Sequence, residues 1–467
     1  MELKARVHEW VETHKNEMLQ TLSEFVQIPS VRDDATAEPG QPFGAACREI
    51  LDAACRKAEE MGLIYKAHEG YCLDVRCQPE MEEEIGIIAH ADVVPISGDW
   101  SFPPFCGKID GDIVLGRGAH DNKCACVMGL YLLKMFKDLG IKTEHGVRLI
   151  FGANEESGME DMRYYKEHVK LPVVSLVPDS LYPANYAQKW GLKGEISLPV
   201  AEDILFLEGG ADFSVPGSAE CIVALPLERV KSLLEDEEEV HCEAASGGTK
   251  LTAKGIATHA ANPWLGKSAL LILCRALKKL PLEGTATKKS IETLCTMTSD
   301  YYGAPMGLAA SDEHTGPTTI VFGRTELRRG RLWVKYVMRN CLATPKEEVI
   351  AKFGQWCAAN SVKIETQEST NPVFFDLNDP RIDALQRVWY GMTRRDDKPF
   401  ASGGNTYSRV VPNAITFGII GYCGKRPDYI PKGTGSAHEA NEYIDIAVVQ
   451  FGIEIYAQAI LALDALV

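Results

Sequence analysis

The sequence predicts an α/β protein in which a doubly wound domain is interrupted by an inserted α+β domain. Strand and helix patterns alternate over residues 1–186, as in a largely parallel sheet covered by helices. Over residues 187–384 the chain is instead rich in β patterns, with a few helical segments between them. The alternating pattern returns over residues 385–467, so we expect the middle part to be an insertion into one domain.

The first helices and strands are predicted from periodicity. Apolar residues at helical spacing between Val7 and Val26 predict one amphipathic helix, and a similar pattern over residues 43–62 predicts a second helix, which ends at a glycine suited to a C-cap. Two short strands then lead to the apolar run at residues 85–89. This run predicts a buried strand that delivers His90 at its end.

The later elements of this domain carry acidic residues at their ends. A polar, turn-rich segment over residues 97–123 predicts a loop, and a helix is expected over about 124–139. Two more apolar strands, GVRLIFGAN and VVSLVP, end immediately before Glu155 and Asp179. Because ligands gather where the strands of an open α/β sheet end, these positions indicate a binding site.

Composition and charge exclude several classes of function. The chain has 467 residues and a formal net charge of −16, from 49 basic and 65 acidic residues. A nucleic-acid-binding protein would need a basic face, and an anionic membrane surface would repel this chain, so we expect neither partner. The amino terminus has no signal-peptide core, and no later segment approaches the roughly 18 to 20 apolar residues of a membrane span.

The cysteines indicate a reducing compartment. The chain has 14 of them, scattered along the sequence and without a C-x-x-C pair. Such thiols usually act as small core residues in a protein of the cytosol. We therefore expect a cytoplasmic protein.

Two imidazoles and several carboxylates form the candidate site. They follow successive strands or precede a helix, and two divalent ions could be held by His90, Asp121, Glu156, Asp179 and His438. Each residue alone has a simpler interpretation, since an acidic pair at a strand end is usually a solvated turn and an aspartate before a helix is usually an N-cap. The repetition of such residues at successive strand ends favours the metal site.

Asp92 and Glu155 suit supporting roles in such a site. The His-x-Asp spacing would let Asp92 hydrogen-bond the far nitrogen of a metal-bound His90 and fix its tautomer. Glu155 stands beside a candidate ligand but is free of the metal. It could take a proton from a water and pass that proton to a leaving nitrogen.

The motifs resemble those of a known enzyme family. In order along the chain, IIAHADVVP, GRGAHDNK, ANEESG, VPDSLYP, GIATHAANPWLGKSA and SAHEANEYI are similar to motifs of the dinuclear zinc metallopeptidases that include aminoacylases, desuccinylases and carnosinases. Within that family the chain most resembles the bacterial PepV-type dipeptidases. The resemblance spans almost the whole chain. It implies that His90 and Asp179 hold one metal, that Glu156 and His438 hold the other, and that Asp121 bridges them.

The resemblance also implies substrate-binding residues, most of them in the inserted domain, which would act as a lid. His259, in GIATHAANP, would polarise the scissile carbonyl and stabilise the oxyanion. Arg339, in YVMRN, would pair with the free carboxylate of the substrate, a task that suits a bidentate guanidinium. Backbone amides of a glycine-rich loop would face the same carboxylate, and this loop comprises Gly403, Gly404, Asn405 and Thr406. Without the motifs, these residues would be a surface histidine, a salt-bridge arginine and a turn.

Three positions depart from the family pattern. Cys124 stands where a glycine is usual, and His120 is an unusual neighbour of Asp121. Phe213 stands where the lids of PepV-type enzymes carry an asparagine that is thought to help hold the substrate. The departure at Phe213 bears on specificity more than on chemistry.

The sequence therefore predicts a metal-dependent dipeptidase, a hydrolase that acts on small peptides with a free amino terminus and a free carboxylate. The expected mechanism is attack by a metal-bridged hydroxide with Glu155 as general base. Imidazole and carboxylate ligands suit Zn²⁺ and leave Mn²⁺ and Co²⁺ as alternatives. We expect a monomer, because the long inserted domain resembles lids whose extra half replaces a partner subunit.

The sequence leaves two other functions open. An N-acyl amino acid deacylase or desuccinylase shares every candidate metal ligand and differs in its substrate. A non-catalytic protein that binds peptides or metal could keep the fold, but it would have no need of the general base Glu155.

Overall fold

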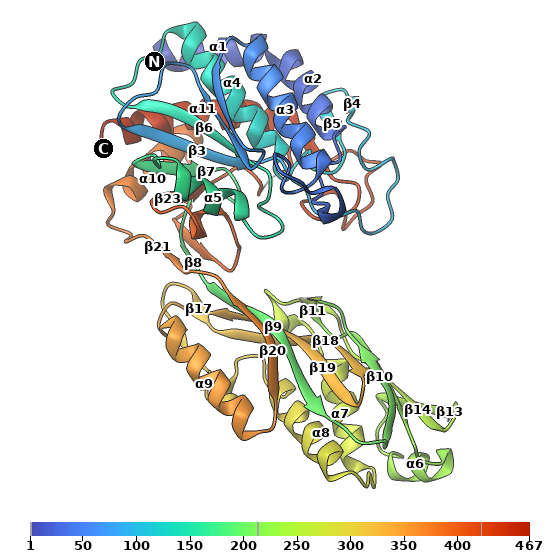
Figure 1. Cartoon of the computed structure of the whole chain (residues 1–467). Coiled ribbons are helices and arrows are strands. Elements are labelled where there is room, and N and C mark those ends of the chain that lie inside the picture. The colour runs from blue at the N-terminus through green and yellow to red at the C-terminus, as the bar shows by residue number, and fades with distance from the viewer. Residues whose placement is uncertain (1, 213, 422) are drawn as a thin grey trace. The chain divides into compact units, whose positions relative to one another are not determined.

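The computed structural model describes residues 2–212, 214–421 and 423–467, so the departure at Phe213 lies outside the described residues. The chain divides into two compact units (Figure 1). Unit 1 comprises Met1–Tyr186, Phe374–Phe400 and Asn405–Val467. Unit 2 comprises Ala187–Val373 and Ala401–Gly404 and is thus an insertion into unit 1.

The chain returns to unit 1 at Phe374, earlier than the expected residue 385. The helix α10 (Pro380–Thr393) already belongs to unit 1, because it packs against α11 (Ile446–Asp464). The carboxylate of Asp379 caps α10 by accepting a hydrogen bond from the backbone N–H of Arg381. Two short strands lie where the chain passes between the units, β21 (Val373–Phe374) and β22 (Phe400–Ser402).

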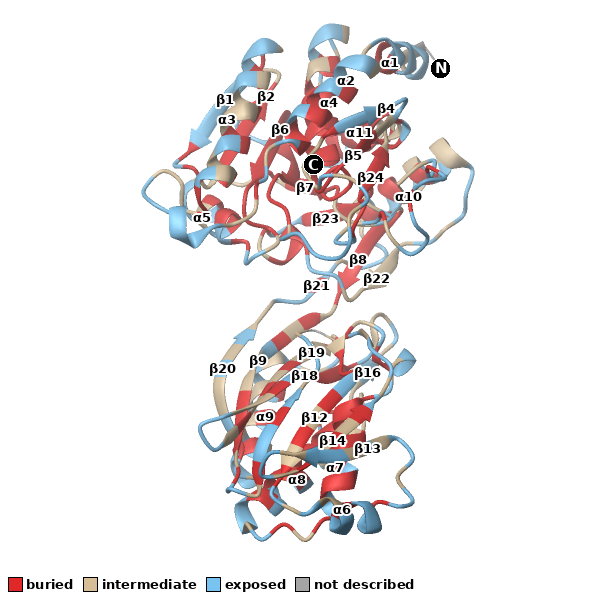
Figure 2. Ribbon diagram, turned by 90° about the vertical axis from the view of Figure 1, so that its right-hand side faces the viewer, coloured by how far each residue is buried: buried red, intermediate tan, exposed pale blue. Residues whose placement is uncertain are grey.

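A mixed sheet forms the centre of unit 1. Its main strands run in the order β1-β2-β6-β3-β7-β23-β8. β6, β3, β7 and β23 are parallel neighbours, whereas β2 pairs antiparallel with β1 and β6, and β8 pairs antiparallel with β23. In the same order, their bounds are Ile64–His68, Cys72–Arg76, Gly146–Gly152, Glu84–His90, Val174–Val177, Ala414–Phe417 and Ala184–Gln188. The apolar sequence of β3 explains its central place, since the strand is buried along its whole length. Its neighbours β6 and β7 are likewise buried (Figure 2).

Helices cover both faces of this sheet. α4 (Lys123–Leu139) lies on one face, where Leu149 of β6 packs against Gly129, and α11 packs beside α4. α5 (Glu160–His168) covers the other face, because Ile150 of β6 clusters with Met162. Adjacent residues of a strand point to opposite faces, so unit 1 is doubly wound, as predicted. The other helices of unit 1 are α1 (Glu2–Thr13), α2 (Lys15–Val26) and α3 (Ala45–Glu60).

Two local expectations for unit 1 were wrong. The first predicted helix is two helices, α1 and α2, which are separated at His14. The segment over residues 97–123 is more than a loop, because it contains β4 (Lys108–Asp110) and β5 (Ile113–Leu115). β5 pairs with β24 (Tyr443–Asp445) from the far end of the chain, and this pairing buries Leu115. A strand with so distant a partner leaves little trace in its local sequence.

The apolar composition of α11 fits its place in the core of unit 1. By length and composition alone this helix could cross a membrane, and it is the one helix of the described residues that passes this test. Most of it is buried within unit 1, where it packs against α1, α4 and α10. A helix that is apolar on all sides is typical of a buried core position.

Unit 2 has the predicted α+β architecture. Its large antiparallel sheet runs in the order β13-β14-β12-β10-β18-β19-β9-β20. In that order the strands span Val240–Ala245, Gly248–Lys254, Ser218–Val223, Ile204–Gly209, Thr319–Arg328, Arg331–Asn340, Trp190–Pro199 and Lys363–Ser369. The helices are α6 (Leu227–Leu233), α7 (Ala269–Lys279), α8 (Thr285–Thr298) and α9 (Lys346–Ala359). All four contact the sheet, and their apolar residues form one core with alternate residues of β19.

Small paired segments complete unit 2. β11 (Ser214–Val215) pairs with β15 (Thr258–His259), and β16 (Ser311–Asp312) pairs with β17 (Gly316–Pro317). The β11–β15 pair carries one of the predicted substrate-binding residues.

Candidate active site

The ends of consecutive elements in unit 1 bring the predicted metal-binding residues together. β3 ends at His90, and the loops after β6 and β7 carry Glu156 and Asp179. These strands are parallel, so their carboxyl ends lie at one edge of the sheet. Asp121 precedes α4, and His438 comes from the loop before β24.

The two histidines face one shared carboxylate. His90 Nε2 lies 3.2 Å from Asp121 Oδ1, and His438 Nε2 lies 3.3 Å from Asp121 Oδ2. His438 Nε2 is also 3.0 Å from Glu156 Oε1, and His90 Nε2 is 4.0 Å from Asp179 Oδ2. Asp121 therefore stands between a His90–Asp179 pair and a His438–Glu156 pair.

The donor set fits divalent metal ions. Ligand atoms of His90, Asp121 and Glu156 all lie within 4.8 Å of one another, and so do those of His90, Glu155 and Asp179. Asp121 Oδ1 and Glu155 Oε1 are buried, and neither accepts a well-directed hydrogen bond within the described residues. A buried carboxylate oxygen without a donor is costly, and a cation would satisfy it. Imidazole and carboxylate are ordinary ligands of Zn²⁺ and similar ions.

Crowding of the carboxylates supports the same interpretation. Burial and the nearby Asp179 raise the pKa of Glu155 well above its usual value. Burial and the nearby Asp121 likewise raise the pKa values of Glu156 and Asp179. These negative groups repel one another in a poorly solvated site, so a divalent cation would stabilise their ionised forms.

The same carboxylates raise the pKa values of the two histidines. Hydrogen bonds to Asp121 and Glu156 raise the pKa of His438 to about 11. Burial opposes a charge on His90, but the nearby carboxylates of Asp121 and Asp92 outweigh burial and raise its pKa. Metal binding would compete with protons for these imidazoles.

Asp92 contacts the loop after β6 as well as His90 at the end of β3. The backbone carbonyl of Asp92 lies 3.0 Å from His90 Nδ1, whereas the nearer carboxylate oxygen lies 3.5 Å from that atom. The carboxylate instead accepts hydrogen bonds from the backbone N–H groups of Glu155 and Glu156, each at 3.0 Å. Asp92 therefore links the end of β3 to the segment that carries the candidate base.

Sequence reasoning missed several buried residues that hold this edge of the sheet together. The side chain of Asn122 accepts a hydrogen bond from the backbone N–H of His90 at 3.4 Å and donates one to the carbonyl of Pro178 at 2.9 Å. Asp161 Oδ2 accepts hydrogen bonds from two backbone N–H groups just before Glu155 and from the Tyr407 hydroxyl at 2.5 Å. Polar residues at helix starts are common, so their role was not visible in the sequence.

Two of the three departures from the family pattern are accommodated in the structure. Cys124 is buried in the first turn of α4, and its thiol donates to the carbonyl of His120 at 3.0 Å. His120 is also buried, and its Nδ1 lies 3.5 Å from Cys423 Sγ. Neither side chain makes an ion pair with a candidate metal ligand among the pairs found in the described residues.

His259 and Arg339 belong to the same face of the sheet in unit 2. Alternate residues of β19, such as Met338, point into the helix-covered core, so Arg339 and Val337 point to the other face. Val337 packs there with Val215 of β11 and with Ala260, which directly follows β15. The segment that bears His259 therefore lies on the face that carries Arg339.

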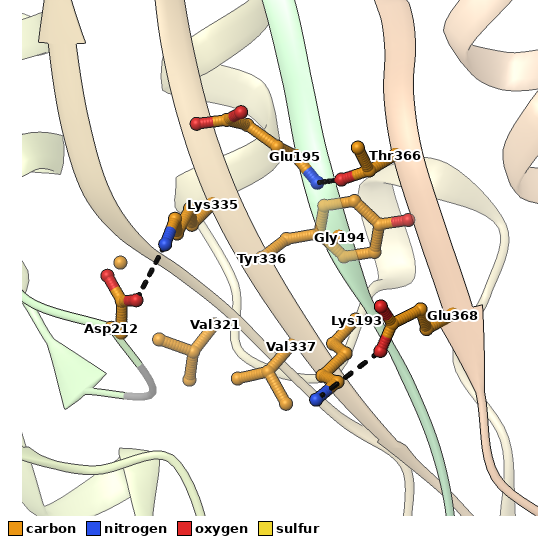
Figure 3. A pocket seen from close by; sticks show the side chains of 11 residues that line it. Lys193, Gly194, Glu195, Asp212, Val321, Lys335, Tyr336, Val337, Thr366 and Glu368 are labelled. Carbon is orange, nitrogen blue, oxygen red and sulfur yellow. Dashed lines mark hydrogen bonds and ion pairs between the residues drawn. The ribbon is translucent and has the colours of Figure 1, made fainter. Parts of the chain in front are cut away.

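Arg339 has no carboxylate partner among the described residues, unlike two lysines of the same face. In the neighbouring cavity of about 340 Å³, Lys335 lies 2.7 Å from Asp212 and Lys193 lies 3.5 Å from Glu368 (Figure 3). Among the described residues, the guanidinium of Arg339 has one partner, the backbone carbonyl of Gly403, and its Nε is buried without any. Burial lowers the pKa of Arg339, so an anion would stabilise its charged form.

The predicted glycine-rich loop is divided between the two units. Gly403 and Gly404 belong to unit 2, where the carbonyl of Gly403 contacts Arg339. Asn405 and Thr406 belong to unit 1, and the Thr406 hydroxyl lies 3.1 Å from that of Thr416. Within unit 2, the loop and Arg339 therefore meet at this one carbonyl.

Comparison with known proteins identifies the family. The chain belongs to the peptidase family M20/M25/M40, whose family model matches residues 86–462. "Putative dipeptidase YtjP" of Bacillus subtilis is 27% identical, with 96% of this chain and 97% of that protein covered. A Staphylococcus haemolyticus protein with the same type of name is 25% identical, with 97% and 98% covered.

Solved structures show the same fold. Human carnosine dipeptidase 1 superimposes with a TM-score of 0.58 at 13% identity, with 99% of both chains covered. The metallo-carboxypeptidase Sso-CP2 of Sulfolobus solfataricus gives a TM-score of 0.58 at 16% identity, with 97% of this chain and 100% of that chain covered. The predicted family and fold are confirmed, and the chain is a metallopeptidase, and hence a hydrolase, by family.

Proposed function

We propose that the protein is a metal-dependent dipeptidase that holds two divalent ions in unit 1. His90 and Asp179 would hold one ion, Glu156 and His438 the other, and Asp121 would be shared. The observation that carries the proposal is that the two oxygens of Asp121 face two different histidines, at 3.2 and 3.3 Å. A carboxylate between two imidazoles suits a bridging ligand.

Glu155 would act as general base and then as general acid. Bound divalent ions would supply Lewis acidity and lower the pKa of a water at the site. Glu155 is buried, and its Oε1 has no hydrogen-bond donor among the described residues, so this oxygen is free to take a proton. Its raised pKa would fall again near cations, which would leave it able to accept the proton and return it to the departing amine.

The residues of unit 2 would recognise the substrate. Arg339 has a buried Nε and no carboxylate partner in the described chain, so we assign it to the free carboxylate of the peptide. Backbone amides of the loop that Arg339 touches would assist it, from Gly403 to Thr406. His259 is exposed on the same face and would polarise the scissile carbonyl.

The proposed substrates, metal and cellular setting draw on further observations. The two curated relatives are named as dipeptidases, and the structural neighbour from human is a carnosine dipeptidase, which supports small peptides as substrates. We propose Zn²⁺ as the metal, because its ordinary ligands are those present. We also propose a cytoplasmic protein, since all 14 cysteines are free, and a monomer, because the long inserted domain resembles lids whose extra half replaces a partner subunit.

A turnover assay tests the proposal. The protein would be stripped with a chelator and restored separately with Zn²⁺, Mn²⁺ or Co²⁺, then offered dipeptides, tripeptides, and N-acetyl or N-succinyl amino acids. We expect metal-restored cleavage confined to dipeptides. Cleavage of acylated amino acids alone would make the protein a deacylase with the same site, and no turnover with any metal would favour a binding protein.

A further inference from the structure

A buried ion pair lies directly behind the proposed metal site. Arg117 precedes Asp121 in the chain, and Glu442 follows His438. Arg117 Nη1 lies 2.6 Å from Glu442 Oε2, and the residues are 1% and 0% exposed. Burying two charges is expensive unless further hydrogen bonds compensate the lost hydration. The remaining contacts of both side chains therefore show what this pair does.

Glu442 holds the loop that presents Asp121. Its Oε1 accepts hydrogen bonds from the backbone N–H groups of Gly118, His120 and Asp121, at 2.9, 2.9 and 3.0 Å. Three N–H groups that converge on one oxygen form a cradle for a single negative charge. The position of Asp121 thus depends on an ionised side chain from the far end of the sequence.

Arg117 holds the loop that presents His438. Its Nη1 donates to the carbonyl of Glu439 at 3.1 Å, and its Nη2 donates to the carbonyl of His438 at 3.4 Å. The guanidinium also lies over the ring of Trp100, 5.2 Å from its centroid. His438 has a φ of +64°, which is uncommon for a residue with a side chain and persists where surrounding contacts fix the backbone.

We propose that the Arg117–Glu442 ion pair is a positioning device that fixes Asp121 relative to His438 and thereby sets the affinity for the metal ion that these two residues share. The inference rests on the metal assignment of the proposed function. Each member of the pair holds the backbone of one ligand, so their mutual attraction couples two ligands that are distant in sequence. Groups that orient metal ligands in this way typically change metal affinity by 10- to 100-fold when they are removed.

The test is a metal titration of the full-length Glu442→Gln variant. Chelator competition with Zn²⁺ measures the affinity of each equivalent, and the visible absorption of Co²⁺ reports the ligand geometry. The amide keeps the shape of the carboxylate but removes its charge. We expect the equivalent held by Asp121 and His438 to bind roughly 10- to 100-fold more weakly, with an altered Co²⁺ spectrum, and the other equivalent to lose less affinity.

Glu84→Gln is the matched control. Glu84 is also a buried carboxylate of unit 1 that is paired with arginines, Arg76 and Arg148, but it lies at the opposite end of β3 from His90. This variant should lower the melting temperature and leave both metal affinities unchanged. Equal losses of metal affinity in the two variants would show that the effect is general destabilisation and would overturn the inference.

A second variant keeps the inference testable if Glu442→Gln fails to fold. Arg117→Lys keeps the positive charge beside Glu442, but a single ammonium cannot replace the planar fork that reaches two carbonyls. We expect a folded protein with about tenfold weaker binding of one equivalent. Wild-type affinity in a folded variant of either kind would overturn the inference, and so would the loss of folding in both variants. A wild-type protein that binds no metal would instead refute the proposed function.

Discussion

The two units support the proposed chemistry in different ways. In unit 1, the candidate ligands His90 and Asp121 are 1% and 9% exposed and lie within hydrogen-bonding distance of each other. In unit 2, His259 is exposed in a strand of two residues, and Arg339 contacts a single loop carbonyl among the described residues. A metal site gains from ligands that are fixed in advance, whereas groups that meet a substrate must be reachable. Variants of the two units should therefore fail in different ways.

Removal of the metal should have the largest effect. Treatment with a chelator should abolish turnover, because the proposed reaction needs the Lewis acidity of the bound ions. Turnover should return when a divalent ion is added, and the fold should persist, since unit 1 has its own helix-covered core. Full activity in a preparation that contains less than one ion for each chain would contradict the assignment.

Glu155→Gln should remove most of the activity and leave the metal in place. The loss of a general base typically costs about 10²- to 10⁴-fold in kcat. Metal content is measured by elemental analysis, and Glu160→Gln, an exposed substitution in α5, is the control. A variant with near wild-type kcat would remove Glu155 from its proposed role.

His259→Ala tests the contribution of unit 2 to the chemical step. The loss of one group that stabilises an oxyanion typically lowers kcat by about 10²- to 10³-fold. Metal content and the Co²⁺ spectrum should stay unchanged, because the proposed ligands all belong to unit 1. If the variant lost metal instead, the division of roles between the units would be wrong.

Arg339→Met should weaken substrate binding more than the chemical step. Loss of a charge-assisted hydrogen bond costs about 1.5 to 3 kcal/mol, so we expect kcat/KM to fall by roughly 10- to 100-fold, mainly through KM. A dipeptide amide, which lacks the free carboxylate, should show no such loss. Arg331→Met is the control, because Arg331 lies at the other end of β19 and points to the same face. An equal loss with both substrates would argue against recognition of the carboxylate.

Asp74→Asn should change stability and leave activity nearly intact. Burial alone would raise the pKa of Asp74, but hydrogen bonds from His68 and Tyr165 outweigh burial and lower it. Because the pKa in the folded state is below that in the unfolded state, the stabilising effect is present above about pH 4 and is lost as the pH falls through the lowered pKa.

The measurement is the free energy of unfolding of wild type and the Asp74→Asn variant between pH 3 and pH 7. We expect a difference of about 2 kcal/mol at pH 7 that shrinks below about pH 4. A loss of metal affinity would show that this buried group, which lies in β2 near the edge of the sheet, also serves the site.

The local sequence predicted the elements whose signals are local. The apolar run of β3 predicted a buried strand, and the acidic residues after β6 and β7 marked the edge of the sheet. The local sequence did not predict β5, because this strand pairs with β24, which is distant in the chain. The predicted return to unit 1, at residue 385, is later than the observed one at Phe374. Nothing in the sequence before α10 indicates that this helix packs on α11.

The sequence by itself determined the architecture, the family and the residue types of the site, because periodicity and ordered motifs are properties of a linear chain. Tertiary structure alone decided which atoms meet, such as His90 Nε2 and Asp121 Oδ1 at 3.2 Å. It also decided that Glu442 cradles the loop of Asp121, since hydrogen bonds between segments distant in the chain form only after folding brings them together. The physical reason is that site geometry depends on contacts across the chain, whereas sequence patterns report each segment alone.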